Sequence, residues 1–417
     1  MAIPLKVIAP TAMQHYDCTG CGDCCRGRFA IIITQADRDR IEKQGWSDSE
    51  LGLEGKPLFV PRGSDFQLAH DSTGACVFLG DDNLCRIHGK YGEAAKPLAC
   101  RMYPFRLIPL GSQVRVDVRF DCPATSGNLG RAIPAHKADL TVLLKSVAPE
   151  GVSDAVVPKF NATTTLPWAQ LARVMEAFDR VLLDVSIDIT RRIAGCVNLN
   201  AILRQMRLTG IGDADLDELL DTLTADVQAA AAADPLKRKP LLGIEGSMFR
   251  HLLDIYCRID EVGKRSSQSS RLATSLRMLS GQGSVPALRD GFPITTFKAI
   301  DALSSIPTGD AALAVERYLH VHLTSMGYFG RGFYGRSFTD GLNSLLLTYP
   351  LISWVARAIA IGEGLATIDK QCTERAMAII DHQHGVTPML NTSSSKFVTN
   401  MLTDRRVLRA LVIWYGS

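Results

Sequence analysis

The sequence predicts an α+β protein: a small, irregular, cysteine-rich N-terminal domain with short β-hairpins, followed by a mostly α-helical C-terminal region. Eight of the eleven cysteines fall within the first 122 of 417 residues. Short β-prone runs bounded by Gly, Pro, Asn and Asp occupy the same part. From about residue 135, apolar residues recur at helical spacing. We therefore expect a cysteine domain at residues 1–130 and a helical domain at residues 131–417.

The N-terminal domain is centred on the stretch Cys18-Thr-Gly-Cys21-Gly-Asp-Cys24-Cys25, which places four thiols within eight residues. Its glycines allow the backbone to curl and turn several sulfurs toward one point. Four more cysteines follow before residue 123. The pattern predicts a metal or iron–sulfur centre, and the candidate ligands are Cys18, Cys21, Cys24, Cys25, Cys76, Cys85, Cys100 and Cys122.

Thiolates are soft ligands that suit zinc and iron–sulfur centres. Zinc takes four ligands, and iron–sulfur clusters usually take four cysteines each. Eight cysteines therefore allow two such sites, or one site with spare thiols that pack as small apolar side chains. Neighbouring side chains diverge, so Cys24 and Cys25 serve two different atoms or sites, or one of them is not a ligand. A multinuclear cluster or two adjacent sites fits this better than one zinc ion.

The first elements follow the cysteine motif. Residues 28–34 are apolar and β-branched, which predicts a buried strand. Thr34 or Asp37 could cap a helix over about 35–44, and residues 51–65 are rich in Gly and Pro, which indicates a loop. Residues 75–79 and 84–88 flank Gly80-Asp-Asp-Asn83 and predict a hairpin with Cys76 and Cys85 on facing strands.

Two more elements carry the last candidate ligands. Pro97 suits a first helical turn and Pro104 forbids its continuation, so Cys100 is expected on a short helical turn. Residues 106–109 and 114–120 predict a second hairpin, which ends at Cys122.

The C-terminal region shows apolar faces at helical spacing, most clearly over 168–182. Cys196, Cys257 and Cys372 lie alone in such segments and are expected to be buried structural thiols. The remaining predicted helices cover about 189–208, 214–233, 247–262, 270–280, 311–326, 340–362, 369–384 and 396–415.

Several polar residues near the cysteines have two interpretations. His88 is either a ligand or a structural histidine, and Asp121 is either a hydrogen-bond acceptor beside the centre or a surface acid. Arg101 and Arg106 either neutralise a thiolate-rich centre or are ordinary solvated arginines. His382 and His384 point to different faces of one helix, which argues against joint metal binding.

Composition narrows the function classes. The net charge of +3 gives no argument for nucleic-acid binding. The first residues lack the pattern of a signal peptide, so we expect a cytoplasmic protein, where structural disulfides are rare. The apolar stretch 342–366 contains Pro, Arg and Glu and favours a buried core helix over a membrane span. No glycine-rich nucleotide loop or hydrolase motif is present.

The cysteine order resembles the YkgJ-type cysteine-cluster family, expected to chelate zinc or iron. The resemblance covers about residues 15–125. It rests on the C-x2-C-x2-CC motif, Cys76, Leu84-Cys85-Arg-Ile-His88 and the Cys100-Arg-Met-Tyr-Pro-Phe105 signature.

Longer members of that family include flagellin lysine N-methylases, which also carry a helical region after the cysteine cluster. Residues 315–349 are loosely similar to their C-terminal part. The resemblance implies methyl transfer from S-adenosylmethionine to lysines of a flagellin-like protein, with an iron–sulfur cluster, of which [4Fe–4S] is the expected type. The alternative is a non-catalytic zinc- or iron-binding module whose helices bind a partner. Catalytic and methyl-donor residues are not identifiable from the sequence.

Overall fold

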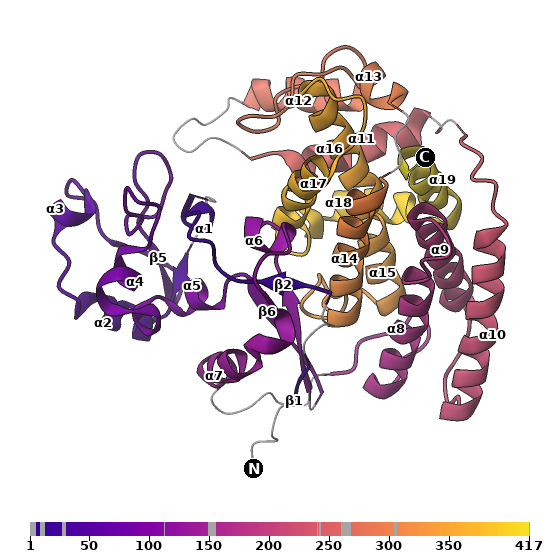
Figure 1. Ribbon diagram of the computed structural model, residues 1–417, viewed down its shortest axis with the longest axis horizontal. Helices are drawn as coiled ribbons and strands as arrows, with labels where there is room; N and C mark the ends of the chain where they lie inside the picture. The colour runs from indigo at the N-terminus through magenta and orange to yellow at the C-terminus, as the bar shows by residue number, and fades with distance from the viewer. Residues whose placement is uncertain are drawn as a thin grey trace.

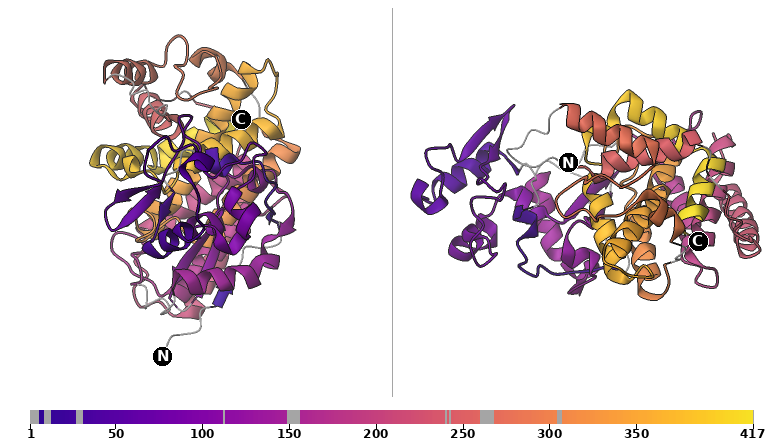
Figure 2. Two further views of the ribbon diagram at one scale, coloured as in Figure 1. Left: turned by 90° about the vertical axis from the view of Figure 1, so that its left-hand side faces the viewer. Right: turned by 90° about the horizontal axis from the view of Figure 1, so that it is seen from above.

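The computed structural model describes residues 6–8, 13–26, 31–111, 113–148, 156–239, 241, 243–259, 268–303 and 307–416. Figure 1 shows a small lobe to one side of a larger helical body, and the view from above in Figure 2 shows the same separation. We call residues 17–26 and 31–103 the cysteine lobe. The expected α+β class, with short strands first and helices after them, is confirmed.

The strands form three small sheets. In the first, β1 (Lys6–Ile8) pairs in parallel with β7 (Gln113–Val118), which pairs antiparallel with β6 (Phe105–Leu110). In the second, β2 (His15–Tyr16) pairs with β8 (Arg131–Ala132). The third has the order β3 (Ile32–Ile33), β5 (Asp65–Leu68), β4 (Phe59–Arg62) and belongs to the cysteine lobe.

Several local predictions for the N-terminal part are confirmed. Helix α2 (Gln35–Glu42) starts at a capping box, in which Thr34 accepts from the N–H of Asp37. The second hairpin forms as β6 and β7, with Leu110 opposite Gln113. Cys100 lies on the short helix α5 (Leu98–Met102). The predicted strand at 28–34 is reduced to β3, and residues 27–30 lie outside the described part.

The predicted hairpin around residues 80–83 is wrong. Only single bridges form there, between His70 and Cys76 and between Leu79 and Cys85. Asp82 accepts from the N–H of Leu84, and the chain then enters helix α4 (Arg86–Tyr91) instead of a second strand. The turn chemistry was right, but a turn does not decide which element follows it.

The prediction of a loop over residues 51–65 is also partly wrong. Helix α3 (Asp48–Leu51) ends at Gly52, and β4 begins at Phe59. Pairing with β5 holds β4, which contains a proline, as an edge strand. The Gly and Pro residues that indicated a loop do not reveal this pairing.

Helices dominate the chain after residue 136. The long ones are α7 (Lys137–Val147), α8 (Trp168–Leu182), α9 (Ile189–Gln205), α10 (Asp213–Ala232), α11 (Gly243–Cys257), α12 (Gln268–Ser280), α14 (Gly309–Ser325), α15 (Phe338–Leu346), α16 (Thr348–Gly362), α17 (Lys370–Gln383), α18 (Ser393–Leu402) and α19 (Arg405–Gly416). The short helix α13 (Phe297–Ala302) lies among them, whereas the short helices α1 (Asp23–Arg26) and α6 (Pro123–Ser126) belong to the N-terminal part.

Two predicted long helices are each divided in two. The segment predicted at 340–362 breaks at Leu347 into α15 and α16, and Pro350 lies in the first turn of α16, where its missing N–H is tolerated. The segment predicted at 396–415 breaks before Arg405, where Asp404 accepts from the N–H of Arg406. Apolar periodicity continued across both breaks, which is why the sequence did not show them.

The stretch Phe338–Gly362 is long and apolar enough to span a membrane by composition, but 89% of its most apolar window is buried inside the protein. Trp354 and Tyr349 of α16 are almost completely buried. Helix α16 therefore forms the centre of the helical body, as its interrupted apolar pattern indicated.

Buried apolar side chains form two clusters. The larger joins the helices to β6, β7 and α7, so the second hairpin packs with the helical body. The smaller lies within the cysteine lobe and includes Ile33, Phe78 and Ile87. The division at residue 130 stays a prediction.

Polar contacts also fasten the helical body to the N-terminal part. Arg317 of α14 donates to the side chain of Gln14 (3.0 Å) and to the carbonyl of Ser126 (2.6 Å), and all three residues are buried. Asp381 of α17 accepts from the N–H of Phe120 (2.8 Å). Helix α14 thus holds residues 14 and 126, and α17 holds the segment that ends at Cys122.

Candidate metal centre

The cysteine motif turns on two glycines. Gly20 and Gly22 have φ of 69° and 77°, which L side chains rarely adopt. A Cβ on Gly22 would lie 3.0 Å from the carbonyl oxygen of Asn83. These glycines let the backbone of the motif turn tightly, as the sequence pattern predicted. The packing of Gly22 against the turn at residues 80–84 was not predicted.

Hydrogen bonds fix this turn against the motif. The guanidinium of Arg26 donates to the carbonyl of Cys21 (3.0 Å) and to the side chain of Asn83. The N–H of Cys76 donates to the carbonyl of Cys25 (2.9 Å). A residue 51 positions along the chain is therefore placed directly beside the CC pair.

Two helix starts position further thiols. Cys85 occupies the position before α4, where Gly89 bonds back to its carbonyl. Helix α5, which carries Cys100, is anchored by Asp37, whose carboxylate accepts from the N–H of Leu98 (3.1 Å). Cys122 lies before α6 and is nearly buried.

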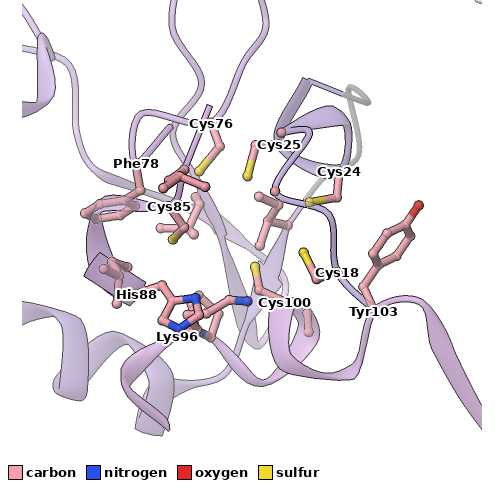
Figure 3. Close-up of a pocket in the computed structure, with 18 of the residues that line it drawn as sticks. Cys18, Cys24, Cys25, Cys76, Phe78, Cys85, His88, Lys96, Cys100 and Tyr103 are labelled. Carbon is pink, nitrogen blue, oxygen red and sulfur yellow. The ribbon is translucent and has the colours of Figure 1, made fainter. Parts of the chain in front are cut away.

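One pocket of about 510 Å³ is lined by six of the eight predicted ligands. They come from the motif, the 76–85 turn and α5, and Figure 3 shows their sulfur atoms around one shared space. These six are Cys18, Cys24, Cys25, Cys76, Cys85 and Cys100.

The other two predicted ligands do not line this pocket. Burial raises the pKa of Cys122 to about 11, and the charge of Cys21 contributes to that rise. Burial raises the pKa of Tyr16 above its usual value, and the charges of Cys122 and Cys18 raise it further. Cys21 and Cys122 thus act on each other electrostatically, but neither lines the six-thiol pocket.

All eleven cysteines are free thiols. Burial raises the pKa of Cys76 and of Cys100, each to about 12. The hydrogen bond with Cys25 raises the pKa of Cys24. These thiols hold their protons at neutral pH, so a bound metal would have to displace them.

Among the described residues, no three Cys, His, Asp or Glu side chains stand close enough together to hold one metal ion. A tetrahedral zinc needs its sulfurs about 2.3 Å from one point. The thiols around this pocket are more widely spread, although their chemistry and common direction suit a soft metal. A group of several atoms matches such spacing better than a single ion does.

The cations beside the thiols differ from those that the sequence indicated. Lys96 and Arg119 line the pocket, and the charge of Lys96 lowers the pKa values of Cys24 and Cys100 against the other effects. Arg106 instead faces Asp117 (3.5 Å), and Arg101 does not line the pocket. Lys96 directly precedes Pro97, where the turn that carries Cys100 begins, but spacing alone did not distinguish it from a surface lysine.

The structure shows where His88 and Asp121 lie. His88 lines the thiol pocket, close to Lys96 in Figure 3, which leaves both of its interpretations open. The side chain of Asp121 is only 4% exposed, so the surface interpretation is wrong. Asp121 accepts from Tyr103 (3.0 Å) and from Arg119 (2.7 Å).

The three isolated cysteines are buried in helices, as expected. Cys196 makes a long contact of 3.8 Å to the carbonyl of Phe178. His382 faces Asp121 (3.3 Å), whereas His384 contacts the hydroxyl of Tyr256 (2.9 Å). The two histidines thus serve different partners, as their spacing predicted.

Comparison with known proteins agrees with the cysteine pattern. Residues 17–123 match the family model CxxCxxCC, described as a "putative zinc- or iron-chelating domain". This is the YkgJ-type family, and the match covers all eight predicted ligands. The search of curated proteins and the search of solved structures found no match.

Proposed function

We propose that this protein is a metalloprotein whose cysteine lobe holds an iron–sulfur cluster, with zinc as the competing occupant. The six thiols that line one pocket carry this proposal. The size of that pocket, together with the absence of a tight three-ligand group in the described part of the chain, favours a multi-atom cluster over a lone ion. Four cysteines usually hold one such cluster.

The ligands of this centre would come from both sides of the pocket. Cys24 and Cys25 cannot comfortably bind one small ion together, but two atoms of a cluster can accept them separately. Cys76, Cys85 and Cys100 complete the surrounding wall. When bound, an iron–sulfur group would supply electron transfer, whereas zinc would chiefly stabilise the fold.

We further propose that the protein is a cytoplasmic protein-lysine N-methyltransferase that uses S-adenosylmethionine and acts on a flagellin-like substrate. The similarity to flagellin lysine N-methylases supports this, as does a second cavity between the cysteine lobe and α17. In that reaction the sulfonium–methyl bond breaks, a nitrogen–carbon bond forms, and the lysine amine loses a proton.

The competing function is a non-catalytic module in which metal stabilises the lobe and the helices bind a partner. Two observations favour it. The described sheets have at most three strands, and neither they nor the sequence contain a glycine-rich methyl-donor loop. Measurements of metal content and of methyl transfer distinguish the two functions.

The full chain would be purified without oxygen, and its iron, sulfide and zinc contents would be measured beside its visible spectrum. We expect a brown protein that transfers tritium from methyl-labelled S-adenosylmethionine to a flagellin-like protein. A colourless protein with stoichiometric zinc and no transfer would establish the module instead.

A Cys25→Ser variant separates a chemical centre from a structural one. If the variant folds but loses methyl transfer, the centre takes part in the chemistry. If it unfolds, the metal is structural. Cys372→Ser is the matched control, because that cysteine is buried in α17, away from the pocket.

A further inference from the structure

The described residues that line the thiol pocket include basic side chains but no aspartate or glutamate. Lys96 and Arg119 stand in its wall beside the six cysteines. His88 also lines the pocket and adds a positive charge only when it is protonated. The wall therefore offers cations, and no carboxylate, to the group that the thiols hold.

Buried carboxylates already offset the charge of Arg119. Its guanidinium lies 2.7 Å from the carboxylate of Asp121 and 3.8 Å from that of Asp381. The side chains of these two acids are 4% and 2% exposed, so water screens the contacts little. Arg119 therefore contributes little net positive charge to the thiol pocket.

Lys96 has a much weaker partner. Its ammonium lies 4.0 Å from the carboxylate of Glu93, whose side chain is 63% exposed, so water screens this contact. The side chain of Lys96 itself is only 18% exposed. An ammonium that is largely removed from water needs a negative charge nearby to be stable. The charge of Lys96 is thus available to the pocket.

Backbone contacts hold Lys96 at the wall of the pocket. Its N–H donates to the carbonyl of Glu93 (3.0 Å) at the end of the short 3₁₀ helix η1 (Glu93–Ala95). Its carbonyl accepts from the guanidinium of Arg40 (2.9 Å). Pro97 follows and restricts Lys96 to an extended conformation, with φ of −66° and ψ of 154°. The lysine therefore stands on a firmly held backbone.

Lys96 acts on thiols from two different segments. The hydrogen bond with Cys25 raises the pKa of Cys24, and the charge of Lys96 opposes that rise. Burial raises the pKa of Cys100, and Lys96 again opposes the rise. Figure 3 shows Lys96 beside Cys100 in the pocket. A cation in this place favours negative charge on the sulfurs.

We propose that Lys96 is the counter-cation of the metal centre, and that the thiol pocket selects a four-thiolate centre of net negative charge. Four thiolates carry more negative charge than a divalent zinc ion or an iron–sulfur core offsets. Burial of such a group without a cation would be costly. This inference rests on the proposed metal centre and adds the residue that balances its charge.

Retention of metal tests the charge of Lys96 with either occupant. The full chain would be purified without oxygen in its metal-loaded form, and the loss of iron or zinc to EDTA would be followed over time. We expect Lys96→Met to lose metal about tenfold faster than the wild type, the scale on which partners outside the ligand set usually weaken metal binding. Lys96→Arg keeps the positive charge and should restore most of the retention.

Two control variants separate this charge from other roles of the side chain. Lys90→Met removes an exposed lysine of the same lobe, which lies over the ring of Trp46 (4.7 Å) and does not line the pocket, so metal loss should not change. Glu93→Gln removes the ion partner of Lys96 and leaves the ammonium. Metal loss should stay equal or become slower in that variant. Loss as fast as in Lys96→Met would assign the effect to the ion pair and overturn the inference.

An iron–sulfur centre offers the reduction potential as a second measurement. An electron supplied by dithionite makes the cluster more negative, so the loss of a nearby cation disfavours the reduced form. We expect the potential to fall in Lys96→Met and to recover in Lys96→Arg. A tenfold change in the equilibrium corresponds to about 59 mV for one electron. If the centre is zinc, the retention measurement decides alone.

Equal metal loss from the wild type and Lys96→Met, or an unchanged reduction potential, would overturn the inference. Loss from Lys96→Arg as fast as from Lys96→Met would do the same, because charge would then not be the cause. Thermal unfolding verifies that each variant folds, and Lys96→Gln replaces Lys96→Met if the latter does not. A wild type that holds no metal would instead reject the proposed centre itself.

Discussion

The phenol of Tyr103 donates a 3.0 Å hydrogen bond to Asp121, and this pair lies where the thiol pocket meets the second cavity. Asp121 also holds Arg119, whose guanidinium reaches the carbonyls of Asp381 and His382 on α17. The contact between Tyr103 and Asp121 therefore connects the cysteine lobe with the helical body. The residues that take part in these contacts come from three segments that are distant in sequence.

Replacing Tyr103 by Phe removes one hydrogen bond and leaves the ring in place. We expect the free energy of unfolding to fall by about 1–2 kcal/mol, because the buried acceptor Asp121 loses one donor. Urea denaturation would measure this change, and metal content should remain unchanged. Tyr91→Phe is the control, since Tyr91 is 40% exposed and its loss should have a smaller effect.

The effect of replacing a cysteine on the metal content should depend on whether that cysteine lines the thiol pocket. Cys76→Ala and Cys100→Ala each remove a thiol from the wall of the thiol pocket. Less than about a fifth of the metal should remain, because the loss of even an outer-shell partner of a ligand typically weakens metal binding about 10–100-fold. Cys257→Ala, in α11, should keep full metal content. Elemental analysis of the purified variants checks this, and wild-type metal levels in Cys76→Ala would contradict it.

Gly22 should be intolerant of a side chain. Gly22→Ala combines a φ of 77° with a Cβ placed 3.0 Å from the Asn83 carbonyl. Gly45→Ala has a φ of 69° but open space around its Cβ. Both variants carry backbone strain of roughly 1–2 kcal/mol. Metal loss in the Gly22 variant alone would therefore be due to the contact of the added Cβ with the turn. Equal metal contents would count against it.

A buried histidine should make stability depend on pH. His322 lies between Asp117 (3.0 Å) and Asp381 (3.1 Å), which raise its pKa to about 9 although burial opposes them. Arg106, Arg119 and His384 surround the same carboxylates. Because the folded pKa exceeds the unfolded value of about 6.5, this stabilisation is complete below pH 6.5 and is lost as pH rises through 9.

His322→Gln tests this by urea denaturation at pH 6, 8 and 10. The wild type should exceed the variant by about 3 kcal/mol at pH 6, the usual effect of breaking a buried ion pair. The difference should shrink at pH 10. A difference that is constant or grows with pH would refute the charged state of His322.

Much of the cysteine lobe was predictable because its signals are local. Thr34 begins α2 through a side chain three residues from its partner, and Pro97 and Pro104 bound the turn that carries Cys100. The glycines of the motif adopt the turns that their spacing required. Such features depend on a few neighbouring residues, which the sequence shows directly.

The parts that were missed depend on distant partners. Cys85 precedes a helix, and the 80–84 turn before it packs against Gly22, a contact that nothing near Cys85 in the sequence reveals. Asp121 is buried because Arg119 and α17 cover it. Lys96 lines the pocket only once α5 and the motif are assembled. Periodicity likewise could not show where α15 ends, since both sides of the break are apolar.

The small apolar cluster of the cysteine lobe has a practical consequence. Its described members include eleven buried side chains. A core this small contributes little stability of its own, so a bound metal would add a large share. Removal of the metal by a chelator should therefore make the cysteine lobe sensitive to protease, while the helical body resists digestion as one fragment. Mass spectrometry of a brief trypsin digest, with and without chelator, would record that asymmetric loss.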